Sequence, residues 1–373
     1  MYVSVFIANF GFGTYTYFIP VFAQKFGATF YDLGLIGSAV ALSYAFTPFF
    51  VGQLADRVNR SRLLSFALIF NVITTIILLF SRSVADIVLM RFLGGLAWGF
   101  YYPTSEVLVT DLALPEKRVR EMAWYSASVA SGLLVGPVFG GFLIQEMGFS
   151  MMFVLSTVMI AIACVQVMVY IVPVYVKSEP ISLDFSGSAR TIRRLMPWYL
   201  FIACWGIIWA VITTILPGYA NSVGMNTTFI GYLFAAFALS RIGTYVTSEQ
   251  YSMMGENRAL LIATVLMIVG IVLVGVYPSF IGFLVGVILV GGCSGIIFPI
   301  TMGLISRHFP HEKLGAGVGS YETINGLGQA VGPFIVGFIA SLTDISISFI
   351  FTAIFGILMV GFIITGQTYS NNS

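Results

Sequence analysis

Long apolar runs separated by short polar loops dominate the chain. Runs such as Leu63–Phe80 and Leu260–Val276 approach the ~20 residues that a helix needs to cross the apolar part of a bilayer. They lack the strict alternation of apolar and polar residues that a membrane β-strand requires. The pattern therefore predicts an all-α membrane protein. Its twelve expected transmembrane helices cover residues 3–23, 30–54, 62–80, 84–110, 120–145, 151–175, 197–219, 228–250, 259–277, 280–305, 314–341 and 346–367.

The composition supports a chain solvated by lipid. Apolar residues make up 58% of the 373 residues and charged residues 9%, whereas a soluble domain carries about 25% charged residues. We expect membrane lipid as a partner and no nucleic acid, because no basic patch is interleaved with aromatic residues. Cys164, Cys204 and Cys293 fall inside apolar runs without metal-binding spacing, so no metal and no cofactor is expected.

The positive charges predict the orientation in the membrane, because cytoplasmic loops are enriched in Lys and Arg. Placing the N-terminus in the cytoplasm puts 13 of the 17 basic residues in cytoplasmic loops. We therefore expect a multi-pass protein of the cell membrane with both termini cytoplasmic. The thirteen are Arg57, Arg60, Arg62, Lys117, Arg118, Arg120, Lys177, Arg190, Arg193, Arg194, Arg258, Arg307 and Lys313.

An internal repeat relates the two halves of the chain at an offset of 196 residues. The matches concentrate in glycine and proline, where backbone geometry is demanding, so chance is a poor explanation. They include Gly95 with Gly291, Gly99 with Gly295, Pro103 with Pro299, Tyr125 with Tyr321, and Gly136-Pro137 with Gly332-Pro333.

The longest polar stretch, 177–194, predicts a linker between the halves. We expect two pseudo-symmetric six-helix bundles at 1–176 and 197–373, joined by a cytoplasmic linker at 177–196. Six helices per half in the same orientation form a parallel repeat, as in transporters that rock one half against the other around a central site. A duplicated structural bundle without transport is the alternative.

The loop after the second predicted helix reads Gly52-Gln-Leu-Ala-Asp56-Arg57-Val-Asn59-Arg60-Ser-Arg62. It resembles the signature loop of major facilitator superfamily transporters, which has a glycine in place of Asn59. Asparagine tolerates left-handed backbone geometry better than most residues. The resemblance implies that Asp56 and Arg60 form a charge network with Asp111, at the end of helix 4, that closes a cytoplasmic gate including Gly52 and Arg57. Arginines that only anchor the topology are the alternative.

Two further segments carry the resemblance. The start of helix 4, Arg91-Phe-Leu-Gly94-Gly95, is similar to the family's pattern of an arginine before a glycine-rich face. Helix 5 resembles the family's Gly-Pro motif, and helix 11 repeats it, which places the chain near the drug:proton antiporter-like branch. Ordinary helix packing through four-residue glycine spacing is the alternative. The motif residues are Gly132, Gly136, Pro137, Gly140, Gly141, Gly332 and Pro333.

Charges inside membrane spans are costly and mark cavities or partners. In helix 4, Arg91 stands near a stripe of Trp98, Tyr102 and Glu106, which we expect to line the cavity. The alternatives are that Arg91 reaches the outer headgroups and that Glu106 forms an ion pair with an arginine of the following loop. Helix 1 has no acidic residue, and Asn9 is its strongest polar group.

In the second half, Glu322 shares one helix face with Asn325 and Gln329. We expect Glu322 or Glu106 to couple transport to protons, with a satisfied hydrogen bond of Glu322 at a helix interface as the alternative. Arg241 lies within helix 8, where it lines the cavity or extends toward the headgroups. In helix 7, Trp205 and Trp209 are one turn apart and face a substrate, lipid or other helices.

These features predict a secondary active transporter that works by alternating access on a small-molecule substrate. We expect a monomer that exports amphipathic or drug-like compounds coupled to protons. An importer or facilitator of sugars or organic acids is the alternative within the fold, and a membrane sensor or receptor without transport is the alternative of another class. An enzyme is not expected, because the chain shows no nucleophile–base pair, metal-binding motif or phosphate-binding loop.

Overall fold

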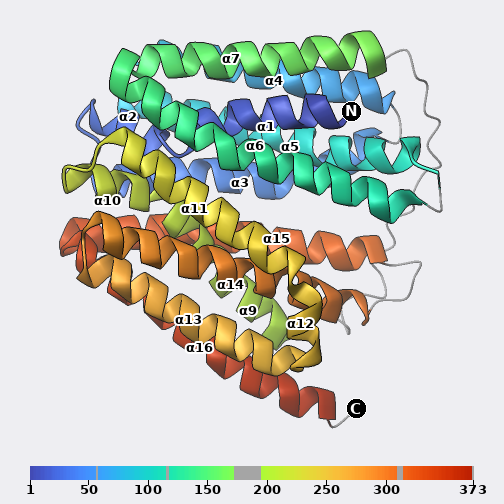
Figure 1. The fold of residues 1–373 in the computed structure, drawn as a ribbon, viewed down its shortest axis with the longest axis vertical. Coiled ribbons are helices and arrows are strands. Elements are labelled where there is room, and N and C mark those ends of the chain that lie inside the picture. The colour runs from blue at the N-terminus through green and yellow to red at the C-terminus, as the bar shows by residue number, and fades with distance from the viewer. Residues whose placement is uncertain (56–57, 115–116, 172–194, 309–313, 372–373) are drawn as a thin grey trace. The chain divides into compact units, whose positions relative to one another are not determined.

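The computed structural model describes residues 1–55, 58–114, 117–171, 195–308 and 314–371 (Figure 1). These residues form helices joined by turns, and they contain no strand. Twelve of the helical segments are long and apolar enough to cross a membrane, which confirms the predicted fold class. The elements of the first half are α1 (Tyr2–Thr16), α2 (Ile19–Gln24), α3 (Phe30–Ala55), α4 (Arg60–Leu79), α5 (Val84–Leu112), α6 (Arg118–Met147), α7 (Phe149–Gln166) and the π-helical turn η2 (Val167–Ile171).

The second half follows the segment 172–194, which lies outside the described residues. That segment includes most of the predicted linker at 177–196. Figure 1 shows α13 running beside α16, and α7 beside α4 in the first half. The elements are α9 (Met196–Thr214), α10 (Leu216–Ser222), α11 (Thr227–Val246), α12 (Ser248–Met253), α13 (Glu256–Val276), α14 (Phe280–Ser306), α15 (Leu314–Leu342) and α16 (Ile345–Asn371).

The predicted first spans of the halves, at 3–23 and 197–219, are confirmed as segments long and apolar enough to cross a membrane, and each is built from two helical pieces. The breaks separate α1 from α2 and α9 from α10, and Pro20 and Pro217 stand in the first turn of the second piece. Proline has no backbone N–H and is well suited to a helix start, so each proline favours a new helix over continuation. The predicted span at 228–250 likewise ends at Val246, before the separate helix α12.

Two compact units organise the contacts. The first comprises Met1–Ala28, Ala39–Ile181 and Gly224–Ala235, and the second comprises Thr29–Ser38, Ser182–Val223 and Ala236–Ser373. Each unit therefore combines most of one half of the sequence with a short helical segment from the other half. The predicted boundary at 177–196 stays a prediction.

The repeat is visible in individual hydrogen bonds. The hydroxyl of Ser83 accepts a bond from the backbone N–H three residues on and caps α5, and Ser279 caps α14 in the same way. Tyr125 hydrogen-bonds the Ser105 hydroxyl over 2.8 Å, and Tyr321 bonds the Thr301 hydroxyl over 3.3 Å. Each of these pairs is related by the 196-residue offset, so the duplication reaches the side-chain contacts of buried helices.

Candidate functional site

An ion pair joins the start of α4 to the end of α5 in the first unit. Arg60 and Asp111 contact each other there, and the Arg60 side chain is only 5% exposed. Asn59 holds the local geometry by accepting hydrogen bonds from the backbone of Ser61 and Arg62, which makes it the N-cap of α4. Its φ is −59°, so this position does not use the left-handed geometry that asparagine tolerates.

The remaining gate residues are described only in part. Gly52 lies in the last turn of α3, and Asp56 and Arg57 are outside the described residues. Their predicted part in the charge network therefore stays a prediction.

A second ion pair occupies the equivalent place in the other half. Glu256 at the start of α13 contacts Arg307, the residue after α14, over 2.5 Å. The 196-residue offset relates Arg60 to Glu256 and Asp111 to Arg307, so the pair is repeated with its charges exchanged. Sequence reasoning missed it because only identical residues were matched, although matching opposite charges would have found it.

A buried polar cluster surrounds Asn9 in the first unit. The Asn9 amide donates to the Val5 carbonyl over 2.9 Å and to the Tyr101 hydroxyl over 3.3 Å, and it accepts from the Tyr102 hydroxyl over 2.9 Å. Tyr44 of α3 packs edge-on against Tyr102. Because Asn9 is fully buried and all its strong bonds are internal, it fixes the tyrosines of α5 against α1.

Arg91 is buried, with 4% of its surface exposed. Its guanidinium lies 5.2 Å from the centre of the Trp98 ring, and its Nε atom has no hydrogen-bond partner within the described residues. The side chain therefore does not extend outward from the protein, which corrects the alternative that it reaches the headgroups. A buried cation over an aromatic face, with no acid in ion-pair contact in the described part of the chain, can attract an anionic group.

The predicted stripe on α5 is graded in exposure. Trp98 and Tyr102 are partly buried and Glu106 is exposed. Trp98 also meets Phe12 of α1, with ring centres 5.8 Å apart. The stripe therefore begins inside the first unit at Arg91 and reaches its surface at Glu106.

Aromatic rings surround Arg241 in the second unit. Its guanidinium lies 4.7 Å from the centre of the Trp209 ring and donates to the Tyr245 hydroxyl from two nitrogens, over 3.0 and 2.8 Å. The side chain is thus held by the rings of Trp209 and Tyr245. Trp205, buried at 4% exposure, continues the cluster beside Trp209 and donates to Ser294 over 3.4 Å.

Several members of this cluster were missed from the sequence. Tyr245 follows Arg241 by one turn, and Phe237 precedes it by one turn, so the spacing on α11 was the available signal. Phe298 closes the cluster from α14, where its ring meets both Trp205 and Tyr245.

Glu322 of α15 faces this aromatic cluster. Its carboxylate is partly buried and interacts electrostatically with Arg241, without forming an ion pair or hydrogen bond within the described residues. The alternative of a satisfied carboxyl is therefore not observed. Asn325, one turn on, is 6% exposed and its carbonyl oxygen has no partner within the described part of the chain, while Gln329 is partly buried. The second unit thus holds a partly buried acid near an arginine, without a direct bond between them in the described residues.

The Gly-Pro motif forms the contact between α6 and α1. A methyl group added at Gly136 would lie 2.7 Å from the Phe10 carbonyl oxygen, and one at Gly132 would lie 2.7 Å from the Phe10 nitrogen. Gly140 closes on Thr14 in the same way, and Gly141 meets Thr227 of α11. In the second unit a methyl group added at Gly332 would lie 2.8 Å from the Ile207 carbonyl oxygen of α9. Pro137 and Pro333 lie inside their helices.

These clusters contain aromatic rings and charged or amide side chains, without a metal-binding group among the described residues. All three cysteines are free and buried, and the described residues contain no group of three His, Cys, Asp or Glu side chains that could hold a metal. What the geometry offers is two aromatic clusters, each with an arginine, and one acid beside the second arginine.

Comparison with known proteins bears on the family and the fold. The chain is 22% identical to the quinolone resistance protein NorA of Staphylococcus aureus, over 98% of this chain and 94% of that protein. It is 24% identical to the uncharacterized MFS-type transporter MJ1560 of Methanocaldococcus jannaschii, over 96% and 95% of the two chains. The crystal structure of the nucleoside transporter NupG has the same fold, with a TM-score of 0.82, 14% identity and 98% of each chain covered.

The family assignment comes from a sequence model of the Major Facilitator Superfamily. It matches residues 1–252 and again 205–372, so the two matches together span nearly the whole chain. Members of this family are transporters, not enzymes, that span the membrane several times. The chain therefore belongs to the Major Facilitator Superfamily.

Proposed function

We propose that this transporter exports amphipathic or drug-like compounds in exchange for protons, by alternating access at the cell membrane, as a monomer with both termini in the cytoplasm. The observation that carries the proposal is the arrangement of Glu322 beside Arg241 in an aromatic cluster. Rings such as Trp209 and Phe298 suit a flat apolar substrate, and the acid suits a proton. The similarity to a quinolone resistance protein supports the same direction.

The proton step follows from the cost of charge in a membrane. A carboxylate away from water is stabilised by a nearby cation and is costly without one. When Glu322 is ionised it attracts Arg241, and when it is protonated Arg241 keeps only its contacts with Trp209 and Tyr245. Proton binding thereby changes which groups face the substrate.

Two further features complete the proposed cycle. Gly132 and Gly136 give α1 and α6 a smooth contact, as Gly332 gives α9 and α15. The Arg60–Asp111 pair belongs to the gate that closes the cytoplasmic side. Trp98, Tyr102 and Glu106 line the substrate path on the first unit, and the buried Asn9 holds Tyr102 in place.

Proteoliposomes with an imposed pH gradient test this proposal, with ethidium as a fluorescent amphipathic substrate. We expect gradient-driven ethidium transport by the wild type. Glu322→Gln should abolish the gradient-driven accumulation and keep ethidium exchange at zero gradient, because the substrate surface remains. Glu146→Gln, at an exposed position near the end of α6, is the matched control and should behave as the wild type. Undiminished accumulation by Glu322→Gln would exclude this acid as the coupling group.

Arg91 favours a second candidate function, the uptake of organic acids. Its buried guanidinium is over Trp98 and has no acid in ion-pair contact among the described residues. An organic carboxylate would supply the missing counter-charge. Uptake of radiolabelled monocarboxylates and dicarboxylates into the same liposomes separates the two functions, because an importer of acids would accumulate them and leave ethidium untouched.

A further inference from the structure

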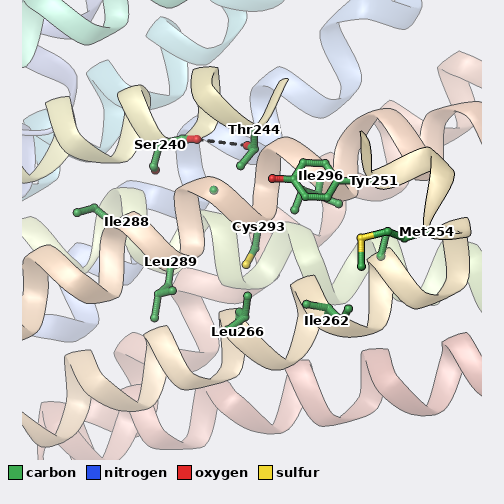
Figure 2. A pocket seen from close by; sticks show the side chains of 12 residues that line it. Ser240, Thr244, Tyr251, Met254, Ile262, Leu266, Ile288, Leu289, Cys293 and Ile296 are labelled. Carbon is green, nitrogen blue, oxygen red and sulfur yellow. Dashed lines mark hydrogen bonds between the residues drawn. The ribbon is translucent and has the colours of Figure 1, made fainter. Parts of the chain in front are cut away.

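An apolar groove opens within the second unit, between α11, α12, α13 and α14, with a cavity volume of about 310 Å³. Figure 2 shows its lining from all four helices. Cys293 and Ile296 are buried at 3% and 9% exposure and form the deep side. Ile262, Leu266 and Ile288 are at least 40% exposed and form the mouth. All these residues lie in segments that cross the membrane, so the mouth opens toward lipid.

Among the polar side chains that line the groove, Ser240 and Thr244 donate to the backbone of their own helix, and the Tyr251 hydroxyl accepts a hydrogen bond from Thr247 over 3.4 Å. The Ser240 hydroxyl donates to the Phe237 carbonyl over 2.9 Å, and the Thr244 hydroxyl donates to the Arg241 carbonyl over 3.0 Å. Their oxygens are thus engaged with the backbone of α11. An occupant therefore gains from burying apolar surface, which favours a hydrocarbon chain over a polar molecule.

The first half of the chain carries larger side chains at the equivalent positions. The repeat relates Gly292 to Leu96, and Ile262 and Ile296 to Phe66 and Phe100. The rings of Phe66 and Phe100 meet edge to face, with their centres 5.6 Å apart. The groove in the second half therefore results from smaller residues at positions where the first half carries larger ones.

An arginine stands one residue before the groove lining on α13. Ala259 lines the groove, and the neighbouring Arg258 in the first turn of α13 is exposed and has no ion-pair or hydrogen-bond partner within the described residues. The nearby Glu256 is neutralised by Arg307. An anionic group at this end of the membrane-spanning helix would therefore be attracted.

We propose that the groove binds an anionic phospholipid, with one acyl chain between α11, α13 and α14 and the phosphate at Arg258. The apolar lining selects the chain and the free arginine selects the headgroup. This inference holds whatever the transported substrate is, because the groove and the aromatic cluster around Arg241 are formed by different residues.

Photolabelling in liposomes tests the proposal. The probes are phosphatidylglycerol and phosphatidylcholine, each with a diazirine in the acyl chain, and the labelled peptides are mapped by mass spectrometry. We expect the label on residues 288–296 of α14 to be several-fold stronger with phosphatidylglycerol. Arg258→Gln should remove that preference and leave labelling by phosphatidylcholine unchanged.

Filling the groove with the residues of the first half supplies the second test. Gly292→Leu should lower the labelling of α14 at least fivefold. A methyl group at this position would lie 3.6 Å from Thr244, which is an ordinary van der Waals contact. The rest of the leucine side chain would then occupy the groove. Gly361→Leu on α16, where a methyl group meets nothing within 4 Å, is the matched control and should label as the wild type.

Ile262→Phe serves as a second filling variant should Gly292→Leu fold poorly, as judged by size-exclusion chromatography. Equal labelling of filled and wild-type proteins, or equal labelling by the two lipids, would overturn the proposal. Displacement of the label by ethidium would also overturn it, because the groove would then be a substrate site.

Discussion

The two halves of the chain place an ion pair at positions related by the repeat, and they bury it to different degrees. Arg60 is 5% exposed and Asp111 is 22% exposed, whereas Arg307 and Glu256 are 59% and 32% exposed. A partly buried pair depends on each partner to offset the loss of water around the other, while an exposed pair is solvated even when broken. The comparison shows that a duplicated contact can keep its position and exchange its charges while its energetic importance changes.

Breaking the two ion pairs should have the largest and most unequal effects. Asp111→Asn leaves the Arg60 cation buried and should lower the free energy of unfolding by about 3 kcal/mol. Glu256→Gln should lower it by less than about 1 kcal/mol, because Arg307 remains in water. Denaturant unfolding in mixed micelles measures both.

Exchanging the charges of the buried pair is the control for that test. The double variant Arg60→Glu/Asp111→Arg reproduces the order of charges in the second half. It should be more stable than Arg60→Glu alone or Asp111→Arg alone. Equal losses for Asp111→Asn and Glu256→Gln would contradict the assigned difference in burial.

Glycine contacts should respond equally in the two halves. Gly136→Ala and Gly332→Ala each place a methyl group within 2.8 Å of backbone atoms and should cost about 2 kcal/mol by overpacking. Gly94→Ala meets nothing within 4 Å and should leave stability unchanged or slightly higher. Thermal unfolding of the three proteins checks the order, and a tolerated Gly136→Ala would show that α1 and α6 can separate.

The aromatic clusters differ in charge at one equivalent position. Thr244 of α11 packs on Gly295, and Thr47 of α3 packs on Gly99 in the same way. These contacts make the two threonines equivalent. Arg241, three residues before Thr244, therefore takes the place of Tyr44, three residues before Thr47. Arg241→Lys keeps the charge and loses the two bonds to Tyr245 and part of the contact with Trp209. We expect an about tenfold weaker apparent affinity for ethidium, equal to about 1.4 kcal/mol. Tyr44→Phe should change that affinity by less than about threefold, and titrated transport rates provide the measurement.

The hydroxyl pairs should show the smallest difference. Tyr125→Phe removes a 2.8 Å bond to Ser105 and should cost about 1 kcal/mol, whereas Tyr321→Phe removes a 3.3 Å bond to Thr301 and should cost less. Both partner hydroxyls keep a bond to a backbone carbonyl, which limits the loss. A larger loss for Tyr321→Phe in thermal unfolding would reverse the comparison.

Much of the fold was predictable because lipid imposes a simple pattern. An apolar run long enough to cross the bilayer must be helical, and twelve such runs were visible in the sequence. The breaks beside Pro20 and Pro217 were missed, since proline often lies inside a membrane helix without ending it. Pro137 and Pro333 do so in this chain.

The site was predictable where residues share a helix, and less so where helices meet. The stripe from Trp98 to Glu106 follows from helical spacing alone. Arg241 illustrates the limit: its charge within a span was visible, but its partners on α9 depend on how two helices pack. Asn59 shows a second limit, because a residue that tolerates two conformations gives no sign of which one the neighbouring backbone selects.

The buried cysteines described above have a practical consequence for spectroscopy. Cys164, Cys204 and Cys293 are 6%, 7% and 3% exposed in this chain of three cysteines. A charged maleimide that stays in water should therefore leave all three unlabelled and react with a cysteine introduced at an exposed site. The natural sequence can thus serve as its own background for attaching paired spin labels or dyes, and the distances between its two halves can be followed during turnover without first replacing any native residue.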